Sequence, residues 1–548
     1  CAWLISFAAA ADLSAPSALT REQLLQDQRQ EALEARLQPQ PADVRILSAA
    51  QTESIDFPSE SPCFPVAAVV VEGGERRVVQ RVETLRRQAL GKCLGTRGIQ
   101  LLMTRMQNRL IESGLITTRV LAPGQELSAG ELRLVIVEGK VSDIRLAASS
   151  RRDINLGTLL PLSSQALLDL RDLEQGLENL QRLPGTEAGF QLLPGALPGE
   201  SVVVVDWQQE RPWRVALTLD DAGSQQTGKR QAGATLFLDN PLGLGDLFYL
   251  SGGMDVLNEG GRGSGSHQIH YSLPLGYWLL GMTADWYDYQ QTVAGGVVDY
   301  RYRGESERYS IQLGRVFHRS DRARTAATLQ ISKRRSDNFI DDAEIALQHR
   351  KTAAWQLSLN HRQFFRQGTL SLELAYSRGT RWFNAEPAPE EAVGEGTALA
   401  RIWSLNALYQ LPVRSGGHAY RYQARVRGQW SDEPLTPQDR FSIGSRWHVR
   451  GFDGQWSLSA DRGWSLSNEV AWRIPRRHQE LYLGLDYGKV AGRGSELLPG
   501  TALAGAVLGM RGTLGRVGYE LFAGAPLQKP AGFHTANRTF GFSLNWQI

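Results

Sequence analysis

The segment FGFSLNWQI at residues 540–548 alternates between two kinds of side chain. One set is large and apolar: Phe540, Phe542, Leu544, Trp546 and Ile548. The residues between them are small or polar. Because successive side chains of a β-strand point to opposite faces, this pattern predicts a strand with one apolar and one polar face. Residues 213–219 alternate in the same way.

Residues 211–548 show this alternation throughout and hold most of the aromatic residues. At roughly 21 residues per strand and connection, a region of this length supplies about sixteen membrane-spanning strands. A soluble sandwich would show the same alternation, but a single sandwich of this size is unusual. A closed barrel also leaves no strand edge unpaired in lipid. We therefore expect a mainly β protein whose residues 210–548 form a sixteen-stranded antiparallel transmembrane β-barrel.

The composition argues against several other classes of protein. Of the 548 residues, 42% are hydrophobic and 21% charged, which excludes wholesale disorder and a helical membrane bundle. The net charge of +3 gives no case for nucleic-acid binding. The nine histidines are scattered without metal-ligand spacing, so no metal, cofactor or catalytic residue is predicted. We expect the protein not to be an enzyme.

Gly223–Lys229 matches most of a phosphate-binding loop. Arg230 stands where that motif needs a Ser or Thr, and strand-like sequence follows instead of a helix. We interpret the segment as the loop between the first two barrel strands.

The first 62 residues divide into three segments. Residues 1–11 are apolar and resemble the end of a secretory signal peptide. Residues 12–37 contain a helix that begins at Thr20 and is polar except for a thin apolar stripe. The stripe includes Leu24, Leu33 and Leu37. Such a helix needs a polar, enclosed surrounding or is loosely attached. Residues 38–62 are aperiodic and are interpreted as a linker.

Two α/β units follow, at residues 63–139 and 140–209, with the same order of predicted elements. In the first unit we expect helices at residues 84–89 and 98–113. Cys63 and Cys93 lie in that unit, and a cysteine pair within one small domain suggests a disulfide and an oxidising compartment.

One loop and one later strand invite a physical pairing. The loop carries Val449-Arg450-Gly451-Phe452 within a glycine-rich stretch. On the strand the odd positions are apolar, so Asp486 should point into the barrel, with Gly484 and Gly488 clearing space on its face. A carboxylate in a cleared surround suits a planar guanidinium such as that of Arg450. The alternative is two unrelated solvated charges.

These residues resemble a known family. Val449-Arg-Gly-Phe452 is similar to the sixth extracellular loop of two-partner secretion (TpsB) transporters, and Gly484-Leu-Asp486-Tyr-Gly488 is similar to its facing strand. Cys63-Phe-Pro-Val66 and Gly91-Lys-Cys93-Leu-Gly95 resemble the first POTRA domain of the haemolysin and contact-dependent growth inhibition branch.

The resemblance implies two POTRA domains at residues 63–139 and 140–209, a Cys63–Cys93 bridge, a plug helix in residues 12–37 and an Arg450–Asp486 latch. It implies a monomer in the bacterial outer membrane, with its POTRA domains in the periplasm. Its partner would be a large secreted exoprotein: a haemolysin, an adhesin or a contact-dependent inhibition toxin. The alternatives are an outer-membrane assembly factor of the same superfamily and a passive porin.

Overall fold

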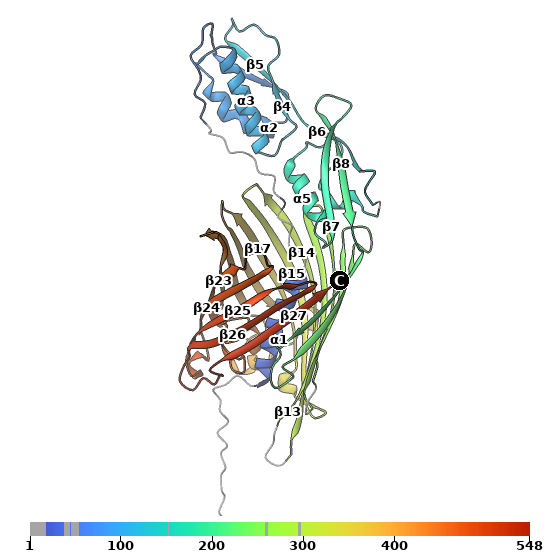
Figure 1. Cartoon of the computed structure of the whole chain (residues 1–548), viewed down its shortest axis with the longest axis vertical. Helices are drawn as coiled ribbons and strands as arrows, with labels where there is room; N and C mark the ends of the chain where they lie inside the picture. The colour runs from blue at the N-terminus through green and yellow to red at the C-terminus, as the bar shows by residue number, and fades with distance from the viewer. Residues whose placement is uncertain (1–17, 38–43, 45–53, 152, 258–260, 294–297) are drawn as a thin grey trace, which may run out of the picture.

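The computed structural model describes residues 18–37, 44, 54–151, 153–257, 261–293 and 298–548. Two small α/β domains follow one another at one end of a large barrel, and a single helix lies inside the barrel (Figure 1). We call this end of the barrel the domain end and the opposite end the loop end. Within the described residues, no helix combines the length and apolarity needed to cross a bilayer.

The described residues form a closed antiparallel barrel of sixteen strands, which confirms the fold class expected from the alternation. The strands are β9 Trp213–Asp220, β10 Gln231–Asp239, β11 Leu247–Asp255, β12 Gly263–Leu275, β13 Trp278–Val293, β14 Tyr300–Arg319, β15 Ala323–Ile340, β17 Arg350–Phe364, β18 Thr369–Thr380, β19 Arg401–Ser415, β20 His418–Trp430, β23 Arg462–Arg473, β24 Gln479–Ala491, β25 Ala502–Leu514, β26 Val517–Gln528 and β27 Thr539–Gln547. The barrel closes where β27 pairs with β9, from Ser543 opposite Asp220 to Gln547 opposite Ala216.

Small elements decorate the loop end. A two-residue strand β16, Ala343–Glu344, extends the hairpin of β15. The 3-10 turns are η1 Ala346–Gln348, η2 Trp382–Asn384, η3 Pro389–Val393, η4 Pro437–Asp439 and η5 Ser495–Leu497. The segment Gly223–Lys229 lies in the loop between β9 and β10, as expected.

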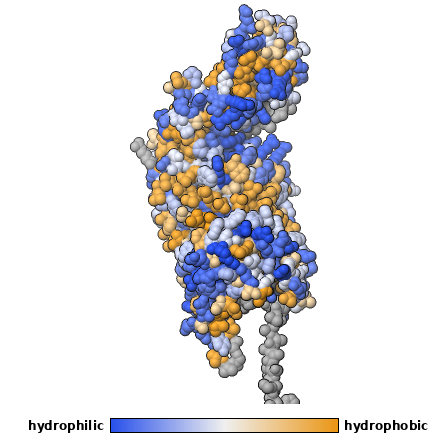
Figure 2. Space-filling model, turned by 180° about the vertical axis from the view of Figure 1, so that it is seen from behind, coloured by the Kyte–Doolittle hydropathy of each residue, from blue (hydrophilic) through white to orange (hydrophobic). Residues whose placement is uncertain are grey.

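The two faces of the barrel wall differ in chemistry. On β24, Leu481, Leu483 and Leu485 are 40–53% exposed on the outside, whereas Tyr482 and Asp486 face inward and are buried. On the face that Figure 2 shows, hydrophobic residues gather over the middle of the barrel, and the surface toward the loop end is more hydrophilic. This arrangement suits a lipid-facing exterior around a polar lumen.

The first α/β domain contains β1 Phe64–Pro65, β2 Ala68–Glu72, α2 Arg76–Gln88, β3 Cys93–Leu94, α3 Thr96–Glu112, β4 Arg119–Leu121 and β5 Glu131–Val137. Its sheet has the order β2-β5-β4, with β2 parallel to β5. The helix expected at residues 84–89 is two turns longer, because Val78, Val82 and Leu85 form one buried face. The first turns were missed although Val78, Val82 and Leu85 have the i, i+4, i+7 spacing of a helix.

The second α/β domain contains β6 Lys140–Leu146, α4 Leu156–Leu159, α5 Leu170–Leu180, β7 Thr186–Pro194 and β8 Glu200–Gln209. Its sheet has the order β6-β8-β7. Helix α5 rests on the rim of the barrel, where Arg319 contacts Glu178 at 2.7 Å and Gln175 at 3.0 Å. The Tyr277 hydroxyl donates to Asp172 at 2.5 Å. These buried polar contacts fix the domain at the entrance of the barrel.

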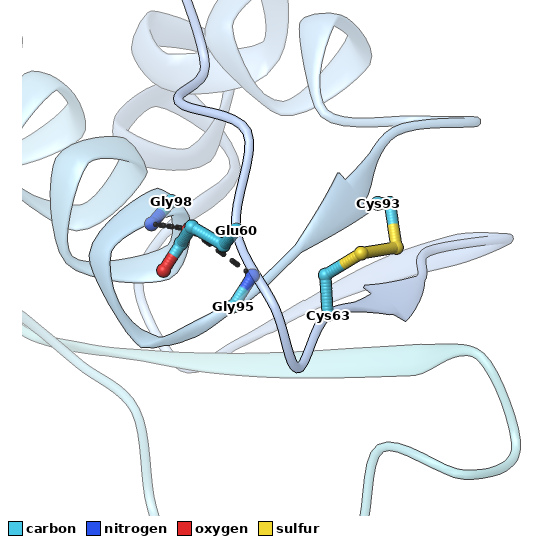
Figure 3. The surroundings of a disulfide bond; sticks show 5 residues. All are labelled: Glu60, Cys63, Cys93, Gly95 and Gly98. Carbon is cyan, nitrogen blue, oxygen red and sulfur yellow. Dashed lines mark hydrogen bonds between the residues drawn. A yellow bond between two sulfur atoms is a disulfide. The ribbon is translucent and has the colours of Figure 1, made fainter.

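A disulfide joins Cys63 to Cys93 and thereby ties β1 to β3 (Figure 3). Beside it, the Glu60 carboxylate accepts hydrogen bonds from the backbone N–H groups of Gly98 at 2.6 Å, Arg97 at 2.8 Å and Gly95 at 3.2 Å. Glu60 therefore satisfies the free donors at the start of α3.

Loss of the disulfide should loosen the first domain. With 30 positions between the two cysteines, the loop-entropy model gives about 3–4 kcal/mol of stabilisation. We expect the Cys63→Ser/Cys93→Ser variant of the full chain to be cleaved faster within residues 63–139 during limited proteolysis, whereas the barrel stays resistant. Reductant should accelerate cleavage of the wild type and leave the variant unchanged; equal cleavage of the two proteins would contradict the prediction.

The Glu60 carboxylate should make the first domain sensitive to acid. Burial would raise its pKa, but the three backbone N–H groups outweigh this effect and hold the pKa below its usual value of 4.5. A lowered folded-state pKa gives stability that is present above pH 4.5 and is lost as the pH falls through the folded value. We expect Glu60→Gln to accelerate proteolysis of this domain at pH 7 and to reduce the difference between pH 7 and pH 3. Asp56→Asn is the matched control, and an identical pH response in the two variants would refute the assignment.

Candidate functional site

Helix α1, Ala18–Leu37, lies inside the barrel and is tied to its inner wall by polar contacts (Figure 1). Glu22 accepts from the hydroxyls of Thr227 and Tyr287, each at 2.8 Å. Glu34 pairs with Arg308 at 2.6 Å. Further contacts join Asp27 to Arg334 at 3.0 Å and Gln30 to Asp285 at 2.8 Å. The enclosed polar surround that the sequence of this helix required is therefore the barrel lumen.

The apolar positions expected on this helix have different surroundings. Leu24 is buried, and Leu33 is half-buried beside the inner wall. Leu37 packs against a small cluster that joins Leu183 of the second domain to Tyr249 of the barrel. The side chain of Thr20 and residues 1–17 lie outside the described residues.

The sixth loop at the loop end, residues 431–461, folds back into the barrel. It contains a small hairpin of β21 Phe441–Ile443 and β22 Leu458–Ala460. Apolar side chains of the loop and the wall form a compact cluster: Phe441, Ile443, Val449, Phe452, Leu458, Ala460, Val490, Leu503 and Phe533. Burial of this apolar surface holds the loop against strands β24 and β25.

Arg450 joins this loop to the wall through a dense set of charge-assisted contacts. Its backbone N–H and its Nε both donate to Asp486 Oδ2 at 2.8 Å, and its Nη2 donates to Asp486 Oδ1 at 2.9 Å. Its Nη1 donates to Glu469 Oε2 at 2.7 Å. The side chains of Asp486 and Glu469 are 1% and 6% exposed, so the guanidinium neutralises two buried carboxylates.

Glycines make room for the guanidinium and its turn. A Cβ at Gly484 would lie 2.6 Å from Arg450 Nη2, and one at Gly488 would lie 2.7 Å from Val449 Cγ2. A Cβ at Gly505 would collide with the Arg450 carbonyl oxygen. Sequence reasoning placed Gly484 and Gly488 beside the Asp486 carboxylate, and the structure adds Gly505 on the next strand.

The turn formed by residues 449–452 has an unusual backbone. Val449 has φ +63°, a left-handed conformation that β-branched residues rarely adopt, and Gly451 has φ +106°. Val449 is fully buried in the apolar cluster, so packing compensates this local strain. The turn places Arg450 against Asp486 and Phe452 against Phe533, whose ring centroid lies 5.8 Å away.

Sequence reasoning missed the rest of the charge network. Glu469 also pairs with Arg511, which reaches Glu480 at 3.2 Å, and Glu480 pairs with Arg421 at 2.7 Å. Alternation along β23 places Glu469 on the inner face, which could have identified it as a lumen carboxylate. Only the register, with Glu469 opposite Gly484, shows that it lies beside Asp486.

Helix α1 and the sixth loop contact each other directly. Gln28 accepts from the Ser445 hydroxyl at 2.6 Å, and its Nε2 lies 3.2 Å from His448 Nδ1. All three side chains are buried. Helix and loop therefore occupy the lumen together, joined to each other and to the wall by polar contacts.

At the loop end, His349 Nδ1 lies 2.6 Å from Asp337 Oδ1 and 3.0 Å from Glu344 Oε1, a grouping that could hold a metal ion. Arg335 also pairs with Asp337 at 2.8 Å. The arrangement is equally that of an ion-pair cluster, and nothing further points to a metal.

Comparison with known proteins decides the family. Residues 199–512 match the protein family described as "Haemolysin secretion/activation protein ShlB/FhaC/HecB". The chain belongs to this family. Residues 64–139 match the ShlB-type POTRA domain, and residues 140–194 match a POTRA domain.

Several relatives resemble the chain over most of its length. The outer membrane transporter CdiB-2 of Burkholderia pseudomallei strain 1026b is 34% identical over 90% of this chain and 88% of its own length. The hemolysin transporter protein ShlB of Serratia marcescens is 27% identical over 86% of this chain and 83% of its own length. The solved structure of CdiB from Escherichia coli superposes with a TM-score of 0.86 at 28% identity and covers 98% of this chain and 100% of that one. The protein is thus an outer-membrane secretion transporter: its POTRA domains lie in the periplasm and its sixth loop on the extracellular side.

Removal of the guanidinium should release the sixth loop. Arg450→Ala leaves the buried Asp486 carboxylate without its cation and leaves Glu469 with Arg511 alone. Loss of one partner of a buried ion pair costs about 3–5 kcal/mol. Ser457, 7% exposed, reports on this docking when replaced by Cys in a Cys1→Ser background. We expect faster thiol labelling of Ser457→Cys in Arg450→Ala than in the wild type, with Arg450→Lys intermediate. Arg322→Ala, a change at an exposed turn of the domain end, is the control. If Ser457→Cys is labelled at the same rate in Arg450→Ala as in Arg322→Ala, the role of Arg450 is disproved.

Proposed function

We propose that the protein exports one large partner polypeptide, of the haemolysin, adhesin or contact-dependent inhibition toxin class, through its barrel. The observation that carries this proposal is the lumen itself, which holds a helix and a loop attached by polar contacts. In this proposal residues 12–37 act as a removable plug and residues 38–62 as its tether. Residues 63–139 and 140–209 receive the partner, and residues 210–548 conduct it.

The contacts of α1 suit a plug that can leave. The helix has a polar surface, and its ion pairs with the wall are partly exposed, as for Glu34 with Arg308 at 27% and 34%. Departure of the helix exchanges these contacts for contacts with water, so it requires little exposure of apolar surface. Gln28 connects this movement to the sixth loop, because its departure removes the acceptor of the Ser445 hydroxyl and uncovers the His448 ring, which keeps its 2.8 Å contact with the Ser442 carbonyl oxygen.

The POTRA domains offer the partner backbone a place to pair. In the described residues β7 pairs with β8 only, so one edge of this nine-residue strand is open. An extended polypeptide can add to such an edge through backbone hydrogen bonds, which tolerate many sequences. The edge lies in the domain that rests on the barrel entrance, where an unfolded partner would be delivered to the lumen.

The contacts between the Arg450 side chain and Asp486 support a latch role for the sixth loop. A bidentate ion pair holds one geometry firmly, yet the surrounding lumen can hydrate both charges when the loop shifts. We propose that the loop moves while the partner passes and returns afterwards, without an enzymatic step, cofactor or nucleic acid. We further propose that one chain suffices, because the barrel closes upon itself.

The two alternatives receive less support. A passive porin needs an open lumen and has no use for two POTRA domains at its entrance. An assembly factor of the same superfamily has no evident use for a helix docked along the lumen, and the family match is to secretion proteins.

Fixing the plug in place should stop export. Asp27 Oδ2 on α1 lies 3.0 Å from Arg334 Nη1 on β15. Cysteines at these two positions, in the variant Cys1→Ser/Asp27→Cys/Arg334→Cys, can therefore be joined by a short bifunctional thiol reagent. We expect cross-linked cells to release almost no partner into the medium, because the helix then cannot leave the lumen. The two single-cysteine variants, treated with the same reagent, should secrete normally. Normal secretion by the fully cross-linked protein would rule out the plug role.

A further inference from the structure

Aromatic rings mark the extracellular border of the lipid-facing surface. Along consecutive strands, ring centroids lie 5.5 Å apart for Trp355 and Tyr376, 4.8 Å for Tyr376 and Trp403, and 6.3 Å for Trp403 and Trp430. Such girdles lie at the level of the lipid headgroups. Outward-facing residues between this girdle and the loops therefore lie among the headgroups of the outer leaflet.

Basic residues occupy most outward-facing positions just beyond this girdle on β15, β17, β18 and β19. We call this group the basic patch: Lys333, Arg335, Lys351, Arg378 and Arg401. Their orientation follows from alternation. Arg334, between two members of the patch, points into the lumen and binds Asp27 of α1. Arg378 and Arg401 each lie two positions from an outward-facing ring of the girdle.

The patch contains like charges placed directly opposite each other. Arg335 on β15 faces Lys351 on β17, and Arg378 on β18 faces Arg401 on β19. Like charges at paired positions destabilise a sheet, so two such pairs on neighbouring strands need a compensating anion.

Protein carboxylates compensate only part of the patch. Arg335, Lys351 and Arg401 each pair with one acidic side chain, at 2.8, 2.7 and 2.7 Å. Among the described residues, no carboxylate lies within ion-pair distance of Lys333 or Arg378. These two side chains lie on either side of strand β17 and one outward position apart in register, since Lys333 is paired with Ala353 and Arg378 with Trp355.

The patch is confined to one side of the barrel. On one side the patch is bordered by Glu307 of β14, which lies opposite Arg335. On the other side it is bordered by Asp432, which follows β20 and pairs with Arg462 at 2.8 Å. Lys489 on β24 has the same place relative to the ring of Tyr487, but its paired neighbours are Trp464 and Ala502. Lys489 lies at a comparable depth and faces no like charge directly, and its diagonal neighbour Arg462 is paired with Asp432.

We propose that the basic patch binds the phosphate groups of a phosphorylated glycolipid in the outer leaflet of the outer membrane. Guanidinium and ammonium groups bind phosphate oxygens strongly, and basic clusters beside a bilayer attract anionic headgroups. The same strands continue toward the membrane centre with Leu329, Leu357 and Leu374, which are 39–49% exposed and suit acyl chains. The surface thus matches both parts of such a lipid: an anionic head and apolar tails.

The patch is separate from the transport machinery. The sixth loop docks on β24 and β25, whereas the patch lies on β15 to β19, and its side chains point away from the lumen. Changes at Lys333 and Arg378 therefore alter the lipid-facing surface without touching α1 or the sixth loop.

Lipid binding to the purified full chain tests the proposal. The probe is diphosphoryl lipid A titrated into detergent micelles of the protein, with bound lipid counted by native mass spectrometry. We expect Lys333→Glu/Arg378→Glu to weaken binding about tenfold or more, because two phosphate-binding cations become anions. Lys489→Glu is the matched control and should bind like the wild type. Monophosphoryl lipid A should bind the wild type more weakly than the diphosphoryl form.

Three results would overturn the proposal: equal binding by the double variant and the wild type, an equal loss in Lys489→Glu, or equal competition by phosphatidylglycerol. The last would show that any anionic headgroup suffices. Heat-modifiable migration in electrophoresis verifies that each barrel is folded. If the double Glu variant does not fold, Lys333→Gln/Arg378→Gln is compared with Lys489→Gln under the same criteria.

Discussion

The structure depends on one constraint: in lipid, every backbone N–H and C=O group must find its partner within the protein. Sixteen strands meet this constraint by closing upon themselves, and the closing pair of β27 and β9 is short, from Ser543 to Gln547. A closed barrel of this size surrounds a lumen too wide for wall side chains alone to fill. The wide lumen therefore follows from the hydrogen bonding of the wall, and it leaves room for a helix and a loop.

Helix α1 and the sixth loop occupy that lumen, and the two are held differently. The helix makes dispersed polar contacts along its length, several of them partly exposed. The loop combines an apolar cluster with the buried carboxylates around Arg450, so its attachment is concentrated and geometrically specific. This difference suits a plug that leaves and a loop that shifts but stays nearby. Gln28, buried between Ser445 and His448, joins the helix to the loop, and in the proposed export mechanism it couples their movements.

The same alternation that builds the wall also sorts charge to its two sides. Along β15, Arg334 serves the lumen while Lys333 and Arg335 face outward at the headgroup level. A run of three basic residues in sequence therefore divides between the lumen, where Arg334 contacts α1, and the outer surface of the barrel. The inner site belongs to the transport proposal, and the outer one to the interaction with lipid.

Much of this molecule could be derived from the sequence, because its wall has a period of two and side-chain direction follows directly from position along a strand. That reasoning gave the barrel, the lipid face of β24 and the inward direction of Asp486. It placed the start of α2 about two turns too late, although Val78, Val82 and Leu85 carry the helical spacing. It also missed Glu469, Arg511, Gly505 and the basic patch, which depend on which strands are neighbours and in what register. The sequence by itself determined which side chains of a strand share a face. Only the tertiary structure decided which side chains meet, because cross-strand register is set by closure of the whole sheet.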